Sequence, residues 1–297
     1  MRTLPFLRAD LDLPTSAGAM PVRSSISGVQ DKVLLACRRG RFSVVSSGGE
    51  YILKPVPSTP LPRFQSDVPA NEDLTMDIAA RVFGIRTAEH ELVAFADGEL
   101  AYMTRRFDSR DGVRIPQEDF CQLSGRTADT AGTNYKYDSS YEECGEIVRR
   151  VCPSFRVELP KLFRRILFSY VFSNGDAHLK NFSVQASRQG DPILTPAYDL
   201  VATSIHVPTE TPLALDLLAG GRYTPEFEAR GFYSGADFLA LGATYGLAES
   251  WVRRQVGCYS GSVGAVHSLI DGSRLSAPAK DAYRAAFADR LRAVTQF

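Results

Sequence analysis

The chain has 297 residues, 44% of them hydrophobic, so it is long and apolar enough to bury a substantial core. Lysine plus arginine and aspartate plus glutamate number 34 each, and this balance gives no overall attraction to nucleic acid or to an anionic membrane. The five cysteines are scattered without a CxxC pair, which argues against a disulfide framework and against a zinc ribbon.

The first 23 residues contain three prolines and no sustained period, so they predict an extended N-terminal extension before a fold that begins near Ser24. From residue 32 to 56, "KVLLACRRGRFSVVSSGGEYILKPV" alternates β-rich runs with Gly and Ser turns. This pattern predicts three short antiparallel strands. Two further strands are expected in "ELVAFADG" and "LAYMTRRFD".

A helix is predicted between these two groups of strands, in "NEDLTMDIAARVFG". One face of this helix is apolar and consists of Leu74, Ile78, Ala79 and Val82. Gly84 is the expected stop, because glycine readily adopts the left-handed conformation that ends many helices.

The second half of the chain is predicted to be helical. The stretch "LPKLFRRILFSYVF" has a wide apolar face and carries Pro160 in a tolerated first-turn position. Further helices are expected at 236–245, 248–270 and 278–294, and the polar, aperiodic "SGRTADTAGTNYKYDSS" is expected to be an excursion loop. The sequence therefore predicts an α+β protein with a β-rich small lobe followed by a helical large lobe. The apolar helix is too short to span a bilayer and the start lacks a signal peptide, so we expect a soluble cytoplasmic protein.

One short segment, "FSNGDAHLKNFS", concentrates polar groups directly after the most apolar helix. Phosphoryl transfer from ATP needs a carboxylate that accepts the hydroxyl proton, and oxygen ligands for Mg²⁺. Protein kinases carry the catalytic Asp and a metal-binding Asn in HRDLxxxN, and Asp176 and Asn181 have the same gap. Asp199, at the end of the short apolar run in "ILTPAYDL", supplies a second chelating carboxylate after a predicted hairpin.

The remaining requirements are a lysine on the phosphates and a glutamate that orients it. Lys54 closes the third predicted strand, and Glu72 opens the helix that follows. Taken alone, Lys54 is a solvated strand end and Glu72 a favourable first-turn acid. The order lysine, glutamate, Asp with Asn, then Asp is the argument for a kinase site.

His178 has two readings: a metal ligand together with Asp176, or a structural hydrogen bond that orients the catalytic loop. We favour the structural hydrogen bond, so His178 is expected to support the metal ligands and not to bind the metal itself. Gln117 and its acidic neighbours are either a solvated corner or a contact to nucleotide or to the lobe interface. The cysteines are expected to be packing residues.

The sequence resembles the HipA-like serine/threonine kinases of bacterial toxin-antitoxin systems. The resemblance rests on "SISGVQDKVLL", "RRFD", "IPQEDFCQLSG", "NYKYD", "NGDAHLKNFS" and "TPAYDLV", which together span residues 24–201. It implies a bilobed protein-kinase-like fold, with an N-lobe over 24–107, a helical C-lobe over 108–297 and ATP held between them. It also implies Lys54 on the phosphates, Asp176 as base, and Asn181 with Asp199 on Mg²⁺. Arg105 to Phe107 would be the linker beside the adenine.

The loop "SSISGVQDK" departs from ordinary protein kinases, because it holds one glycine, Gly28, instead of GxGxxG. Compact family members of the HipT type are autophosphorylated at an SxS pair, which corresponds to Ser25 and Ser27 here. A phosphate in this loop would repel the phosphates of ATP.

The expected function is an ATP-dependent protein serine/threonine kinase that acts as a toxin, with an aminoacyl-tRNA synthetase as a plausible substrate. The resemblance implies HipS-like and HipB-like antitoxin partners, with DNA contacted only through a HipB-like protein. One alternative is a small-molecule or lipid kinase, because related kinases also carry an Asp followed by an Asn in such a loop. Another alternative is a non-catalytic co-repressor that binds the antitoxins. The presence of Lys54, Asp176, Asn181 and Asp199 argues against this alternative.

Overall fold

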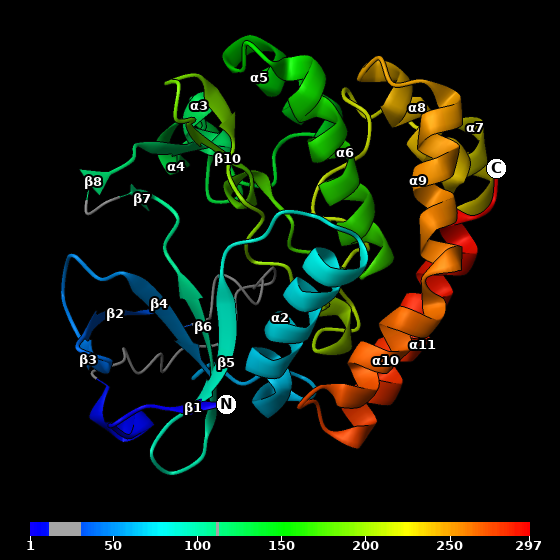
Figure 1. Cartoon of the computed structure of the whole chain (residues 1–297). Coiled ribbons are helices and arrows are strands. Elements are labelled where there is room, and N and C mark those ends of the chain that lie inside the picture. Colours follow the sequence, from blue (N-terminus) through cyan, green and yellow to red (C-terminus); the bar gives the residue numbers. More distant parts are fainter. Residues whose placement is uncertain (12–30, 111–112) are drawn as a thin grey trace.

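In the computed structural model, residues 1–11, 31–110 and 113–297 are described, and a six-stranded sheet forms their first part (Figure 1). The strand order is β1-β5-β6-β4-β2-β3. The strands are β1 (Arg2–Thr3), β2 (Val33–Arg38), β3 (Arg41–Val44), β4 (Tyr51–Pro55), β5 (His90–Ala94) and β6 (Leu100–Arg105). The five strands predicted from the sequence are confirmed, and they pair antiparallel with one another.

The sheet begins earlier in the chain than the sequence predicts. Arg2 and Thr3 form β1, which pairs in parallel with Val93 and Ala94 of β5. Leu4 and Leu11 are buried against the same sheet. The expected start near Ser24 was therefore wrong for the first eleven residues, because a two-residue strand is too short to produce a recognisable period. The rest of the predicted extension lies outside the described residues.

The two faces of the sheet have different neighbours. Leu53 of β4 pairs with Met103 of β6, and both belong to a small apolar core that also contains Leu4. The next pair, Lys54 and Tyr102, points the other way because side chains alternate along a strand. Tyr102 packs into the larger core of the helical part, so this second face carries Lys54 toward the rest of the molecule.

Helix α2 (Val68–Asp77) lies between the sheet and the helical part (Figure 1). A 3₁₀ turn, η2 (Gln65–Asp67), precedes it, and one π-helical turn, η3 (Ile78–Val82), follows. Gly84 has φ of 59°, so the predicted stop is confirmed. The helix begins three residues before the predicted Asn71, with Pro69 in its first turn. Glu72 is therefore in the second turn and does not open the helix.

Small sheets join the two halves of the chain. A three-stranded sheet of order β11-β10-β9 contains the predicted hairpin before Asp199. Its strands are β9 (Gln117–Asp119), β10 (Ser183–Ala186) and β11 (Pro192–Leu194), and β7 (Ser109–Arg110) pairs with β8 (Val113–Arg114). The pairing of β9 with β10 places Gln117 opposite Gln185, just beyond the end of the polar segment 172–183.

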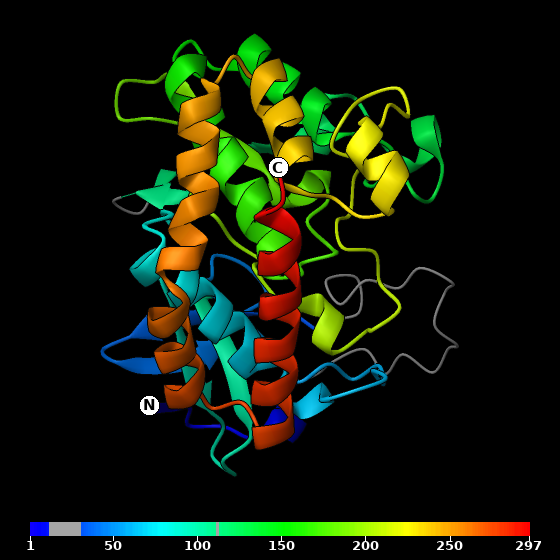
Figure 2. The same ribbon diagram turned by 90° about the vertical axis from the view of Figure 1, so that its right-hand side faces the viewer.

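The second half is helical, as predicted. Its helices are α3 (Phe120–Leu123), α4 (Ala128–Ala131), α5 (Tyr141–Val151), α6 (Phe155–Val171), α7 (Pro225–Arg230), α8 (Gly235–Thr244), α9 (Glu249–Gly261), α10 (Val263–Gly272) and α11 (Ala277–Val294). Figure 2 shows α9 and α10 end to end along the molecule, with α11 beside them. The single helix predicted over 248–270 is divided at Ser262. Pro160 lies inside α6 and not in its first turn, because α6 begins at Phe155.

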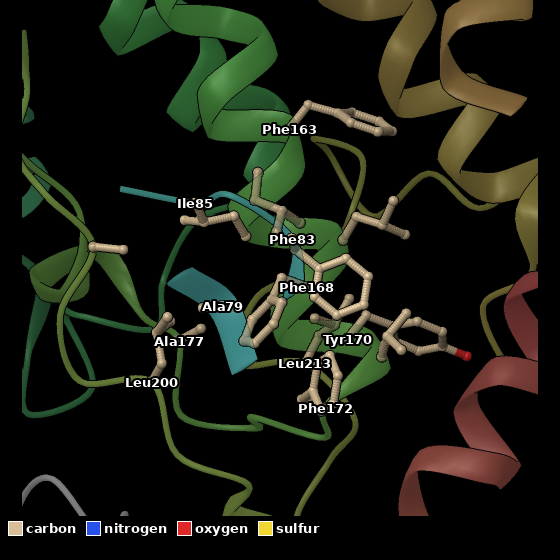
Figure 3. Close-up of a cluster of buried hydrophobic side chains, with 14 of the residues drawn as sticks. Ala79, Phe83, Ile85, Phe163, Phe168, Tyr170, Phe172, Ala177, Leu200 and Leu213 are labelled. Atoms are coloured by element: carbon tan, nitrogen blue, oxygen red, sulfur yellow. The ribbon is translucent and has the colours of Figure 1, made fainter. Parts of the chain in front are cut away.

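The larger core consists mainly of aromatic and aliphatic side chains from α6, α2, η3 and the C-terminal helices (Figure 3). The ring of Phe83 stacks on Tyr259 with centroids 4.3 Å apart, and Phe172 stacks on Phe287 at 5.1 Å. Ala177 and Leu200 belong to the same core. These two residues directly follow Asp176 and Asp199, so packing fixes the segments that carry both carboxylates.

None of the five cysteines, all within the described residues, forms a disulfide, and Cys121, Cys144 and Cys152 are buried as packing residues. Over the described residues, no helix has both the length and the apolar character needed to cross a membrane.

Candidate active site

The candidate catalytic segment, residues 172–183, turns sharply after α6. Ser173 has φ of 52°, in the left-handed region that few non-glycine residues adopt. Asn174 Oδ1 accepts a hydrogen bond from Asp176 N at 3.2 Å, and Asn174 Nδ2 donates to the backbone oxygen of Asp199 at 3.3 Å. Gly175 N donates to Thr203 Oγ1 at 2.8 Å. Through these two hydrogen bonds, the side chain of Asn174 connects the turn at Asp176 to the backbone at Asp199.

Asp176 is 4% exposed, and its Oδ1 accepts a hydrogen bond from the hydroxyl of Tyr137 at 2.7 Å. Tyr137 belongs to the loop that is expected to be an excursion, and no role is predicted for it from the sequence. The one indication of a role for Tyr137 is its position in "NYKYD", one of the segments on which the family resemblance rests. The backbone N–H of Leu179 donates to Lys136 O at 3.2 Å, so the two loops are joined at this point.

The predicted metal ligands Asn181 and Asp199 lie side by side. Asn181 Nδ2 is 3.4 Å from Asp199 Oδ2, and Asn181 Oδ1 accepts from the backbone N–H of His178 at 3.0 Å. Asp199 has φ of 55°, a conformation disfavoured for residues with a Cβ. Such local strain is often found at functional sites.

Lys54 joins the two halves of the site. Its Nζ lies 2.5 Å from Glu72 Oε1 and also contacts Asp199 Oδ1. Burial alone would lower the pKa of Lys54, but the carboxylates of Asp199 and Glu72 raise it above its ordinary value. Burial would likewise raise the pKa of Asp199, and the ammonium groups of Lys54 and Lys32 lower it instead. Lys54 and Asp199 are therefore charged at neutral pH.

The donor set of the site fits a magnesium ion. Asn181 and Asp199 line the same cavity, and an amide and a carboxylate are the side-chain groups that would hold such an ion. Mg²⁺ in kinase sites is held by few protein oxygens and completes its shell with water and substrate phosphates. The described residues contain no group of three His, Cys, Asp or Glu side chains that could hold a metal by themselves.

His178 is buried beside Asp176, with its Nε2 3.8 Å from Asp176 Oδ1. Burial, with the charge of Lys136, lowers the pKa of His178 to about 3, so the ring is neutral at pH 7. The expected structural hydrogen bond comes from the backbone N–H of His178 and not from its ring. Among the described residues, neither ring nitrogen has a hydrogen-bond partner.

The residues assigned to the nucleotide do not all gather at the site. Arg105 has a 57% exposed side chain that pairs with Glu89 at 3.2 Å. The ring of Phe107 lies 5.6 Å from that of Tyr198. Gln117 Nε2 donates to Ser183 Oγ at 3.0 Å, so it contacts the hairpin that carries Asp199. The predicted loop residues Ser25, Ser27 and Gly28 lie outside the described residues.

A cavity of about 730 Å³ opens beside the predicted metal ligands Asn181 and Asp199. Its lining combines the apolar or aromatic Ile115, Pro116 and Tyr198 with polar and charged side chains, among them Gln117, Lys32, Lys136, His178, Lys180, Asn181 and Asp199. This volume lies within the usual range for small-molecule sites. Neither Arg105 nor Phe107 lines it.

The sheet, α2, the helical lobe and the charged cavity between them define a bilobed protein-kinase-like fold, which confirms the predicted fold class. The sequence model of the HipA-like C-terminal domain family matches residues 24–258, and the chain belongs to this family.

Two relatives carry the printed name "Putative kinase". One, from Haemophilus influenzae, is 33% identical over 244 residues, which are 76% of this chain and 68% of the relative. The other, Y4mE from Sinorhizobium fredii, is 34% identical over 241 residues, which are 77% of this chain and 54% of the relative. The chain thus spans about half of the second relative and about two thirds of the first.

Two solved structures share the fold. A chain of the Shewanella oneidensis complex of the toxin-antitoxin proteins HipA and HipB with operator DNA has a TM-score of 0.72 and 21% identity. The match covers 96% of this chain and 68% of that one. The Helicobacter pylori proinflammatory kinase CtkA has a TM-score of 0.58 and 11% identity, over 90% and 91% of the two chains.

Proposed function

We propose that the protein is an ATP-dependent protein serine/threonine kinase that acts as the toxin of a toxin-antitoxin system. The observation that carries the proposal is the contact of Lys54 with both Glu72 and Asp199, beside Asn181 and close to Asp176. These five side chains come from four separate segments, and each corresponds to a part that phosphoryl transfer requires.

Each residue then has a defined task. Lys54, held by Glu72, would neutralise phosphate oxygens of ATP, and Asn181 and Asp199 would hold a magnesium ion. The ion, when bound, supplies positive charge to the phosphates. Asp176 accepts the proton of the attacking hydroxyl, and Tyr137 orients the carboxylate of Asp176 by a hydrogen bond to one of its oxygens. Gln117, with Arg105 to Phe107, is proposed to flank the adenine end.

The proposed partners follow from the family. The Shewanella oneidensis neighbour was solved with HipB and operator DNA, which supports a HipB-like antitoxin and contact with DNA through it. A HipS-like protein is the second proposed partner, as in compact HipT-type systems. The proposed substrate is an aminoacyl-tRNA synthetase, and the proposed compartment is the cytoplasm.

Self-inhibition is part of the same proposal. Ser25 and Ser27 are the proposed autophosphorylation sites, with Gly28 in the loop that covers the nucleotide. A phosphate there adds about −1.5 to −2 charges next to the phosphates of ATP and should eject the loop. Mass spectrometry of the wild type should find phosphate at one of these serines. Phosphate on the same serines in Asp176→Asn, expressed without an active copy, would contradict a self-catalysed reaction.

The function is tested by incubating the purified protein with MgATP and a bacterial lysate, then mapping new phosphoserines and phosphothreonines. A kinase gives new sites that are absent with Asp176→Asn. Phosphorylation confined to small molecules or lipids would favour the alternative kinase class. ATP binding without any transfer would favour the non-catalytic co-repressor.

A further inference from the structure

The loop after η5 (Thr203–Ile205) packs against the catalytic turn, which is the name used here for residues 173–176. A Cβ at Gly175 would lie 2.8 Å from Glu210 Cγ and would overlap the backbone oxygen of Thr211, so this close approach requires glycine. Glu210 therefore lies directly against the turn that carries the proposed catalytic base.

The hydroxyl group of Thr203 links this loop to the catalytic turn. Thr203 is buried, and its Oγ1 accepts a hydrogen bond from Gly175 N at 2.8 Å and donates one to Ser173 O at 3.2 Å. Ser173 has the left-handed φ of 52°, a conformation that persists only where the surrounding structure supports it. A hydroxyl group has a single hydrogen, and in this arrangement Thr203 gives it to Ser173 O.

The carboxyl group of Glu210 forms a side-chain hydrogen bond with Thr203. Since the hydrogen of Thr203 is directed at Ser173 O, the hydrogen of this further bond has to come from Glu210. Only a protonated carboxyl group has a hydrogen to donate, whereas an ionised carboxylate only accepts and would draw the Thr203 hydrogen away from Ser173 O. The protonation state of Glu210 therefore decides whether Thr203 holds the turn.

The surroundings of Glu210 favour the protonated form. Its Oε2 is buried and has no hydrogen-bond partner within the part of the chain that the structure describes. Burial and the negative charge of Asp176 raise the pKa of Glu210 to about 7. On the loop itself, His206 contacts Asn71 Nδ2 and Arg63 O, and burial lowers the pKa of His206 to about 4, so this ring brings no charge at pH 7.

We infer that Glu210 is a positioning residue which, while protonated, holds the catalytic turn in its active shape through the hydroxyl group of Thr203. The inference rests on the proposed kinase function and deepens it, because it adds a control by pH to the same site. Glu210 is not among the residues that line the cavity, so it acts through the turn and not on the nucleotide. Loss of its proton should therefore lower kcat and leave the KM for MgATP unchanged.

The first measurement is the pH dependence of phosphoryl transfer by the whole chain. Radiolabelled MgATP and a bacterial lysate are the substrates, and kcat at pH 6 and pH 8 is compared among the wild type, Glu210→Gln and Glu228→Gln. Glu228 is an exposed carboxylate on α7 and serves as the matched control. Between these pH values Glu210 changes from roughly nine-tenths to roughly one-tenth protonated, because its pKa is about 7.

The ratio of kcat at pH 6 to kcat at pH 8 should be about 5- to 10-fold higher in the wild type and in Glu228→Gln than in Glu210→Gln. The reason is that a neutral amide keeps a donor for Thr203 at every pH. Thr203→Ser keeps the hydroxyl group and should retain the wild-type ratio, while Thr203→Val should lose most of it. The KM for MgATP should change less than about twofold, and urea unfolding at both pH values checks that each variant is folded.

A second measurement follows the link between Glu210 and Thr203 without any catalysis. The amide N–H of Gly175 donates to Thr203 Oγ1, so its NMR signal should shift with a midpoint near pH 7 in the wild type. This shift should be absent from Glu210→Gln. A Gly175 signal that titrates alike in both proteins, or does not titrate in this range in either, would overturn the inference.

The outcomes for the two proposals are distinct. Equal ratios of kcat in the wild type and Glu210→Gln, or a lower ratio in the wild type, would overturn the inference while leaving the kinase proposal intact. A wild type that transfers no phosphate at any pH would instead contradict the kinase proposal. The titration of Gly175 would then still decide whether Glu210 controls the hydroxyl group of Thr203.

Discussion

At the scale of single residues, the site depends on a few charged groups with more than one partner each. Lys54, Glu72, Asp176, Asn181 and Asp199 are all predicted from the sequence, and the structure brings them together. Their order along the chain carried that prediction. Tyr137 and the lysines that line the cavity were not predicted, because an aromatic or basic residue in a polar loop has no period and no fixed spacing that marks its role.

Asp176→Asn should keep the fold and nucleotide binding but lower phosphoryl transfer by about 10²- to 10⁴-fold. The amide preserves the shape of the side chain and an oxygen for Tyr137, but it cannot accept the hydroxyl proton. Transfer is measured with radiolabelled ATP and binding by calorimetry. Near-normal transfer by the variant would remove Asp176 from the role of base.

Asp199→Ala should weaken binding of MgATP about tenfold or more and leave metal-free ADP binding nearly unchanged. The carboxylate would hold the ion that neutralises the phosphates, whereas Lys54 keeps its contact with Glu72. The matched control is Asp191→Ala, an exposed carboxylate in the turn between β10 and β11. Equal losses for MgATP and metal-free ADP would show that Asp199 has no special relation to metal.

At the scale of elements, α2 is fastened to the segment that follows Asp199. Asn71 Oδ1 accepts from Ala202 N and its Nδ2 donates to Ala202 O, both at 3.0 Å. The same Nδ2 lies 2.7 Å from His206 Nε2, and Thr75 reaches Tyr283 of α11 at 3.0 Å. Glu72 therefore sits on a helix whose position is set by the helical lobe.

Asn71→Ala should destabilise the protein by about 1–3 kcal/mol, because it leaves the buried backbone N–H of Ala202 without its hydrogen-bond acceptor. The rate of phosphoryl transfer should fall roughly 10- to 100-fold, because Glu72 and Asp199 are then misplaced. Urea unfolding and the kinase assay measure the two effects. Asp77→Asn weakens only partly exposed contacts, with Arg81 of η3 at 2.9 Å and with His90 at 4.0 Å, so it should change stability by less than about 0.5 kcal/mol. Equal effects of both variants would contradict the role of Asn71.

The loop after η5 (Thr203–Ile205) carries Glu210 against the catalytic turn, where a Cβ at Gly175 would lie 2.8 Å from Glu210 Cγ. Burial raises the pKa of Glu210 from 4.5 to about 7. Between these pH values the folded protein holds a proton that the unfolded chain releases, so stability falls as the pH rises through this window.

Glu210→Gln should remove this dependence. The variant should match the wild type near pH 4.5 and exceed it at pH 8 by roughly 1–3 kcal/mol, since the neutral amide needs no proton. Urea unfolding at several pH values measures the difference. Glu228→Gln, at an exposed position on α7, should keep the wild-type slope. A parallel shift of Glu210→Gln at all pH values would refute the titration.

The elements that were predicted are those with a long or clear period. The alternating strands and the apolar faces of α6 and α11 are of this kind. The short helices α4 and α7 were missed because each has fewer than two turns. The division at Ser262 was missed because residues on both sides of it continue the apolar pattern, with Val256, Val266 and Ile270 all buried.

At the scale of the whole molecule, the structure has two apolar cores and α2 belongs to the larger one. The small core covers one face of the sheet and includes the N-terminal Leu4 and Leu11. The larger core unites α2 with α6 and the C-terminal helices. This division was not predictable from the sequence, which indicated a β-rich lobe ending near residue 107 and assigned α2 to it. Which core a helix joins depends on contacts between distant segments that no local pattern encodes.

The membership of α2 in the larger core changes what an opening of the cleft must break. The sheet brings Lys54 to Glu72 and Asp199, and Lys32, directly before β2, lies 3.9 Å from Asp199. A movement of the sheet away from the larger core therefore separates two ammonium groups from this pair of carboxylates. A phosphate that competes for the same ammonium groups would weaken the contact across the cleft.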